Sequence, residues 1–365
     1  MKKILKKIIV TFLVLIFFSE LISYTLGKLK IIPQGVSDHV TIFANENLSY
    51  WHPKNIKFKY HATGCFQAQQ PSIVYYNNIG ARGRENVYIK KIKPRIALIG
   101  DEMIENIYVS EGLDFASMLR KKINNFEIIN FSARSTGLGD QIDIYKNLIK
   151  KYNVDYVFLF ITDNDFLNNH YTDLDLFRAR YKIINNEVVK ISRNKEWFKK
   201  YNSLPNKLKR SNLILYIKNY SNTFKLYFYF KVKKNLKAKS SPKYLKAKEI
   251  SNDAKIKIFN ENKIIYNFLV NKFINELNND NIKYFAFLNI KPYMFNGKET
   301  LNQKEIFNFF KIVWNDKNIY YPLDSSIKYL KNRKENWSNH KCNDYPKIGS
   351  EFMSNYISDI FNKNK

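Results

Sequence analysis

Residues 95–141 read RIALIGDEMIENIYVSEGLDFASMLRKKINNFEIINFSARSTGLGDQ, and this stretch decides the fold class. Two apolar runs of strand length, 95–99 and 126–130, each end in a polar turn, and a helical pattern over 113–123 separates them. Short apolar runs that end in tight turns and are followed by helices are typical of βαβ units in a parallel sheet. In such sheets ligands bind at the carboxyl ends of the strands, so we expect functional residues in these turns.

The same alternation continues along the chain. Apolar runs of strand length recur at 154–161, 282–289 and 318–323. Helical patterns are expected over 142–152 and 349–361, and a helical face is formed by Ile265, Leu269, Phe273 and Leu277, which recur every fourth residue. Five strands alternating with helices predict a three-layer α/β/α sandwich around a parallel, flavodoxin-like sheet of five strands.

Two segments interrupt this pattern. Residues 29–94 are irregular and rich in aromatic residues, and YYNNIGARG (75–83) predicts a strand that runs into a turn. We interpret 29–94 as a lead-in that packs on the domain of 95–365, and a β-hairpin covering the sheet edge is the simpler alternative. Residues 166–254 predict an insertion with amphipathic helices, interpreted as a cap over the site, with a membrane-surface patch as the alternative.

The N-terminal residues 1–28 predict a membrane anchor. Lys2, Lys3, Lys6 and Lys7 precede an apolar run from Ile8 to Leu26, close to the ~20 residues that cross a bilayer. Flanking positive charges stay in the cytoplasm, which places the rest of the chain outside, in the periplasm or at the cell exterior of a bacterium. A cleaved signal peptide is the alternative. Glu20 inside the run is tolerable near the outer interface.

The chain is strongly basic, with a formal charge of +29 over 365 residues and 45% hydrophobic content. The hydrophobic content is ample for a core. Such a charge raises binding to nucleic acids as a hypothesis. The lysines are spread over nearly every segment and form no compact basic motif, so we expect solvated lysine faces and no nucleic-acid partner.

The two cysteines, Cys65 and Cys342, are too few for a disulfide scaffold. In an oxidising compartment a single pair is often a bridge, and this one would tie the lead-in to the loop after His340. Two unpaired thiols are the alternative, and the sequence does not decide between them.

Motifs at the strand ends resemble the SGNH/GDSL hydrolase superfamily from about Asn78 to the C-terminus. The family's first strand ends in Gly-Asp-Ser with the serine as nucleophile, whereas this chain has Gly100-Asp101-Glu102. The family's second motif, Asn-x-Gly-x-x-Gly, gives a backbone N–H to the oxyanion hole. Here Asn130 and Gly137 remain, while Ser135 stands at the usual glycine position.

The later two motifs are also partly kept. The third, Gly-x-Asn-Asp or a variant, supplies an asparagine to the oxyanion hole, and Asn164-Asp165 preserve that pair. The last, Asp-x-x-His or Asp-x-His, supplies the base and its orienting acid. His340 is kept, but neither aspartate position is acidic. The resemblance thus implies an ester substrate, His340 as base and no cofactor.

Glu102 cannot perform the serine's part in this chemistry. Attack by a carboxylate would leave a mixed anhydride, and its negative charge sits where the oxyanion must form. His340 also lacks its usual partner, for which Glu335, Asp344 or a main-chain carbonyl could substitute.

Three hypotheses follow. In the first, the protein hydrolyses an acyl ester, such as an O-acetylated surface or exported glycan, with Glu102 as the base that activates water. In the second, it is an inactive glycan-binding or assembly module in which Glu102 and His340 pair, and the chemistry slightly favours this reading. In the third, acidic residues and His340 hold a cation, although such acids also serve as helix caps. The residues of that cation site would be Asp101, Glu102, Asp163 and His340.

Overall fold

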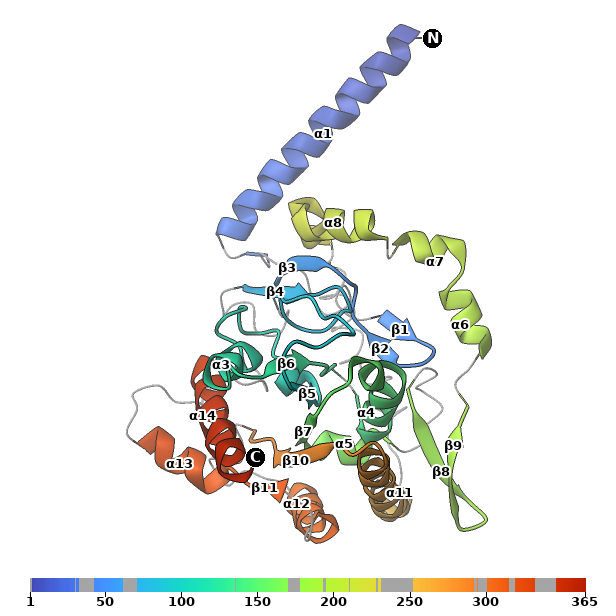
Figure 1. The fold of residues 1–365 in the computed structure, drawn as a ribbon. Coiled ribbons are helices and arrows are strands. Elements are labelled where there is room, and N and C mark those ends of the chain that lie inside the picture. The colour runs from blue at the N-terminus through green and yellow to red at the C-terminus, as the bar shows by residue number, and fades with distance from the viewer. Residues whose placement is uncertain are drawn as a thin grey trace.

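One long helix, α1 (Lys2–Lys28), projects from an α/β body in the computed structural model (Figure 1). The structure describes residues 2–29, 31–32, 43–61, 71–134, 136–169, 178–192, 195–209, 211–227, 229–230, 252–291, 294, 301–314, 319–331 and 346–365. Ser135, His340 and the two cysteines, Cys65 and Cys342, lie outside the described residues. The roles and the bridge predicted for them stay predictions.

The body is built on five parallel strands. These are β5 (Arg95–Ile99), β6 (Glu127–Asn130), β7 (Tyr156–Ile161), β10 (Lys283–Leu288) and β11 (Ile319–Tyr320). Their order across the sheet is β11-β10-β7-β5-β6, and neighbours pair in parallel. In chain order this is 2-1-3-4-5, the flavodoxin-like arrangement. The predicted fold is therefore confirmed.

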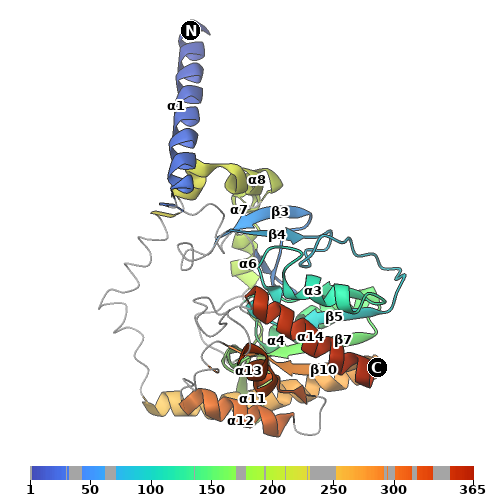
Figure 2. The same ribbon diagram turned by 90° about the vertical axis from the view of Figure 1, so that its left-hand side faces the viewer.

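Helices cover both faces of this sheet (Figure 2). On one face α3 (Phe115–Lys122) packs against α14 (Lys347–Asn364). On the other, α11 (Asn252–Asn279) contacts both α4 (Leu138–Ile144) and α12 (Leu301–Val313). The C-terminal helix is fixed to the sheet by Phe361, whose ring meets edge-on those of Phe126, Tyr156, Phe158 and Phe285.

Several elements differ from the sequence-based expectation. The last strand is shorter than 318–323 because Pro322 has no N–H to donate and is followed directly by α13 (Leu323–Lys331). The helix expected over 142–152 begins earlier, as α4, and continues as a π-helical turn, Tyr145–Ile149, and a 3-10 turn, Lys150–Tyr152.

The insertion contains a β-hairpin that the sequence reading did not find. Strands β8 (Arg180–Ile184) and β9 (Glu187–Ile191) pair antiparallel around Asn185-Asn186, both of which have positive φ. Two consecutive residues with positive φ make the tight turn that hairpins favour, and asparagine tolerates it. Among its described residues the insertion also includes the helices α6 (Lys195–Tyr201), α7 (Leu204–Lys209) and α8 (Asn212–Tyr220).

The lead-in forms two hairpins against the body. They are β1 (Phe43–Asn45) with β2 (Ser49–Trp51), and β3 (Ile56–Tyr60) with β4 (Ser72–Tyr76). After β4 the chain turns at Gly80, whose φ is +83°, and Arg82 bridges both Tyr76 and Asn130. The β3–β4 hairpin is thereby joined to the end of β6.

A buried carboxylate links this lead-in to the first βα turn. Glu105 ends α2 (Glu102–Glu105) and accepts a hydrogen bond from the Tyr76 hydroxyl. Its Oε1 lies 3.2 Å from His52 Nε2, and its Oε2 accepts the Arg134 backbone N–H at 2.9 Å. Burial alone would raise the pKa of Glu105, but Arg134 and His52 hold it well below its usual range.

The anchor helix is tied to the insertion through Glu20. Its carboxylate accepts the backbone N–H groups of Asn222, at 2.7 Å, and Thr223, at 3.2 Å, and the hydroxyl of Ser221. The sequence placed Glu20 near lipid headgroups or water, and the structure gives it these protein partners. It caps the helical turn over 222–227.

We predict that Glu105→Ala lowers the free energy of unfolding by about 3–5 kcal/mol, because it leaves His52 and Arg134 buried without their carboxylate. The comparison is urea unfolding of the full chain in one detergent. Glu305→Ala is the matched control, since Glu305 pairs with Lys263 at the surface, where a pair contributes about 0–1 kcal/mol. Equal effects of the two changes would contradict this account of Glu105.

Candidate functional site

Three neighbouring strands bring polar residues to one edge of the sheet. Asp101 follows β5, Thr162 and Asp163 follow β7, and Lys291 lies just beyond β10. The strand order reverses between β5 and β7, and ligands bind at this switch point in open α/β sheets. These residues form the candidate site.

Asp101 is fully buried and holds the start of α2. It accepts the backbone N–H of Met103 at 3.0 Å and lies 2.8 Å from the Thr162 hydroxyl oxygen. Burial, reinforced by the negative charge of Glu102 and opposed by Lys291, raises the pKa of Asp101 to about 7. Glu102 itself is half-buried at the first position of α2.

Asp165 stabilises the start of a helix at this edge of the sheet. It closes a capping box at the start of α5 (Asp163–Leu167), where it accepts the Thr162 N–H at 2.8 Å. It also accepts the side-chain amide of Gln141 at 3.0 Å. Burial, with Asp101 close by, raises the pKa of Asp165 well above its usual value. Its partners are therefore all within the protein.

Asn164 is oriented by its neighbour. The Thr162 hydroxyl hydrogen-bonds to Asn164 Oδ1, which directs the Nδ2 group away from that contact. Among the described residues no group accepts a hydrogen bond from this Nδ2, and the side chain is half-buried. The amide can therefore donate to a ligand, which is the donor role that the family resemblance implies for it.

Gly137 is engaged inside the protein. Its N–H donates to Asp140 Oδ2 at 3.1 Å, and a β-carbon at this position would lie 2.8 Å from Asn168 Cβ. Asp140 in turn accepts from the Ser49 hydroxyl and from the Ala179 N–H. In this structure the Gly137 N–H is thus directed at Asp140, and the glycine allows a close approach of two segments.

Lys291 and Gln303 are the site residues that the sequence reading missed. The Lys291 ammonium pairs with Asp163 Oδ1, and the Gln303 amide donates to Asp163 Oδ2 at 3.1 Å. Burial would lower the pKa of Lys291, but Asp163, Asp101 and Glu102 raise it. The available signal was the position of Lys291, directly after a predicted strand.

The structure thus brings Asp101, Glu102, Asn164 and Asp165 to one edge and adds Lys291. Ser135 and His340, predicted for the same site, lie outside the described residues. Within the described ranges no cluster of three or more His, Cys, Asp or Glu side chains is arranged to hold a metal. Both carboxylate oxygens of Asp163, one of the predicted cation ligands, are bonded to Lys291 and Gln303.

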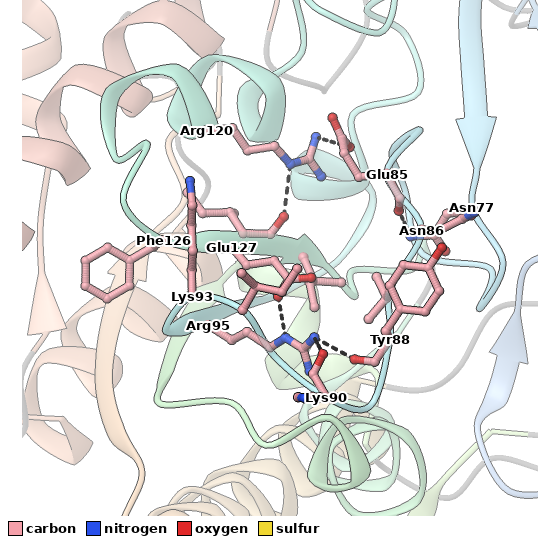
Figure 3. Close-up of a pocket in the computed structure, with 14 residues that line it drawn as sticks. Asn77, Glu85, Asn86, Tyr88, Lys90, Lys93, Arg95, Arg120, Phe126 and Glu127 are labelled. Atoms are coloured by element: carbon pink, nitrogen blue, oxygen red, sulfur yellow. Dashed lines mark hydrogen bonds and ion pairs between the residues drawn. The ribbon is translucent and has the colours of Figure 1, made fainter.

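A separate cavity of about 350 Å³ lies elsewhere, beside the amino ends of β5 and β6 (Figure 3). Arg95 and Glu127 line it and pair at 2.6 Å, and Arg120 donates to the Ile128 carbonyl at 2.9 Å. Because parallel strands begin at one edge and end at the other, this cavity is remote from the carboxyl edge. We assign the candidate site to the carboxyl edge because the polar and charged side chains that follow β5, β7 and β10 meet there.

The raised pKa of Asp101 predicts a specific pH dependence of stability. A carboxyl whose folded pKa is about 7 binds its proton more tightly in the folded state than in the unfolded state. Its contribution to stability is present below the unfolded pKa and lost as the pH rises towards 7. Asp101→Asn mimics the protonated form, so its stability relative to wild type should increase between pH 4 and pH 7.

Urea unfolding of the full chain, followed by tryptophan fluorescence across that range, measures the difference. Asp359→Asn, a change of an exposed carboxyl on α14, serves as the control and should follow the wild-type profile. A difference between Asp101→Asn and wild type that is independent of pH would show that Asp101 titrates normally.

No protein-family model matches the sequence, and a search among curated proteins finds no matching relative. Solved structures of esterases and lipases are similar to the chain. An acetyl xylan esterase is 13% identical, with 73% of this chain and 98% of that chain covered and a TM-score of 0.40. A member of the lipolytic G-D-S-L family from Veillonella parvula is 10% identical, with coverages of 74% and 98% and a TM-score of 0.37.

A lipase/acylhydrolase from Enterococcus faecalis is also 10% identical, with coverages of 74% and 96% and a TM-score of 0.36. Identities this low concern the fold alone. The strand order across the sheet, rather than these likenesses, establishes the architecture described above. The chain is thus similar in fold to solved esterases and lipases, among them a member of the lipolytic G-D-S-L family.

Proposed function

We propose that this chain is a membrane-anchored, extracytoplasmic protein that binds an O-acylated glycan of the cell envelope at the carboxyl edge of its sheet without hydrolysing it. The observation that carries the proposal is Glu102, a carboxylate at the nucleophile position, beside the Lys291–Asp163 ion pair. Serine-type ester cleavage has no hydroxyl nucleophile at this position.

The surrounding donors support binding without turnover. An oxyanion hole needs N–H groups aimed at the developing charge. The Gly137 N–H is directed at Asp140, and the Lys291 ammonium is paired with Asp163. The carboxylate of Glu102 adds a negative charge where the oxyanion of a hydrolase forms. Stabilisation of a tetrahedral intermediate is therefore weak at this edge.

The same edge is suited to a polyhydroxylated ligand. It presents the Asn164 amide, the half-buried Glu102 carboxylate and, around Asp163, the Lys291 and Gln303 side chains. Amides and carboxylates together offer both donors and acceptors, as sugar hydroxyls require. An O-acyl group would bring a carbonyl oxygen that the Asn164 Nδ2 group can bond.

The membrane anchor is supported by the N-terminal helix. Residues Lys3–Lys28 form a helix with a mean hydropathy of 2.1 over its most apolar 18 residues, and it is almost wholly exposed in the described structure. A signal sequence near an N-terminus has the same character. The lysines at the beginning of the helix favour a cytoplasmic N-terminus, which supports an extracytoplasmic α/β body, in the periplasm or at the cell exterior.

A second function is favoured by one observation at the same site. Asp101, with its pKa raised to about 7, lies next to Glu102, and paired carboxyl groups in unlike environments are typical of acid–base catalysis. In this alternative Glu102 activates a water molecule for attack on the ester, and the Asn164 amide stabilises the oxyanion.

The binding of O-acetylated polysaccharides to the full chain in detergent tests the proposal. Wild type should bind acetylated polysaccharide more tightly than the same polymer after de-acetylation. Asn164→Ala should weaken that binding about 5- to 150-fold, because one hydrogen bond in a shielded site contributes about 1–3 kcal/mol. Lys263→Ala, a change on α11 of a partly exposed lysine that pairs with Glu305, is the control and should have no effect.

The acetate released in the same samples separates the two functions. The proposal predicts no release above that of Asn164→Ala, and Glu102→Gln should leave this result unchanged. Release by wild type that Glu102→Gln abolishes would instead establish the water mechanism. Binding that is indifferent both to acetylation and to Asn164→Ala would contradict the proposed ligand and its site.

A further inference from the structure

Residues 211–227, here called the arm, have two unlike faces. One face of α8 is seated on the lead-in, where Leu215 is buried beside Phe58. Asn219 exchanges hydrogen bonds with β3, as its Nδ2 donates to Lys57 O at 2.8 Å and its Oδ1 accepts the Lys59 N–H at 3.3 Å. The arm is therefore fixed to the body.

The other face of the arm is exposed. Its large exposed apolar and aromatic side chains are Leu213, Tyr216, Ile217, Tyr220 and Tyr227.

Leu213, Tyr216, Ile217 and Tyr220 recur at helical spacing on α8, so these exposed side chains share one face of the helix. Leu213 is 68% exposed, and its neighbours on α8 are mostly apolar or aromatic. Contiguous exposed apolar residues mark sites that contact a partner or a membrane. Tyrosine is characteristic of the membrane–water interface, where its ring is apolar and its hydroxyl remains hydrated. Lys218 borders the group and can reach lipid phosphates.

Contacts with the anchor helix α1 fix the position of the arm along the direction of that helix. Glu20 caps the turn that begins at Asn222, and the Ser19 and Thr223 hydroxyls are 3.0 Å apart. Glu20 lies eight residues before Lys28, which corresponds to about 12 Å along the helix. If the apolar run of α1 crosses the bilayer, the arm residues bonded to Glu20 must lie at the depth of its outer part.

The orientation of the arm agrees with this level. In two views at right angles α8 lies beside the C-terminal end of α1 and across its direction (Figures 1 and 2). A helix that lies across a membrane span is parallel to the membrane plane. This is the geometry of an interfacial helix, whose apolar face enters the boundary between headgroups and acyl chains.

We propose that the arm is an interfacial membrane-binding element that inserts its exposed face into the outer leaflet next to α1. The inference rests on the membrane anchoring in the proposed function and adds a second attachment to it. Two attachments set the height and tilt of the body. The carboxyl edge of the sheet is then held at a defined orientation to the membrane surface.

Photoreactive lipids test this inference on the full chain. The protein is reconstituted into nanodiscs of phosphatidylethanolamine and phosphatidylglycerol that carry a diazirine in the acyl chain, and lipid adducts are mapped by mass spectrometry. We expect adducts on α1 and on the arm. Residues 88–92 provide the control, since Tyr88, Ile89 and Ile92 are exposed residues of the body that lie shortly before β5 in the chain. Labelling of the arm should exceed labelling of 88–92 severalfold.

The double change Leu213→Asp with Tyr216→Asp should remove the arm adducts and leave those on α1. Both side chains are mainly exposed, so the fold does not depend on them. Adducts on α1 with none on the arm above the level of 88–92 would overturn the interfacial element while sustaining the anchor. No adducts on α1 would show that the membrane anchoring itself is wrong.

Discussion

The buried carboxylate of Glu105 is the interaction on which the rest of the structure depends. It lies at the end of α2, one turn after Asp101 and Glu102. It accepts hydrogen bonds from the lead-in and from the turn after β6. A buried carboxylate without these partners would be strongly destabilising. The lead-in is consequently part of the structure that sets the candidate site, because it supplies His52 and Tyr76 to this carboxylate.

A second constraint is the crowding of acidic groups where β5 and β7 end. Asp101 and Asp165 are both buried and both contact Thr162, and burial together with the charge of Asp101 raises the pKa of Asp165. Lys291 brings one positive charge to this group, and Asp163 holds it in place. The site thus holds one ion pair and a further negative charge at Glu102, a property that suits recognition of a neutral, polyhydroxylated ligand better than stabilisation of a developing oxyanion.

The sequence predicted the five strands, their parallel arrangement and the strand-end turns, because a buried parallel strand is a continuous apolar run that can be recognised locally. It could not predict the contacts of Glu105 with His52 or of Lys291 with Asp163, since those pairs are far apart in the chain and meet only after folding. The β8–β9 hairpin carried a local signal at Asn185-Asn186 that the reading missed. The sequence placed Asn164 after the third strand, where the structure also has it, whereas the bond of the Gly137 N–H to Asp140 could not be predicted from the motif.

The proposed function requires that the Glu102 carboxylate occupies the nucleophile position and that no hydroxyl at the carboxyl edge acts in its place. The most direct test is the intact mass of the full chain after treatment with a fluorophosphonate, which phosphonylates activated serine and threonine hydroxyls. We expect an unchanged mass for the wild-type protein, since Thr162 hydrogen-bonds within the site and Glu102 carries no hydroxyl. A stoichiometric adduct that maps to a serine or threonine at the carboxyl edge of the sheet would contradict the account.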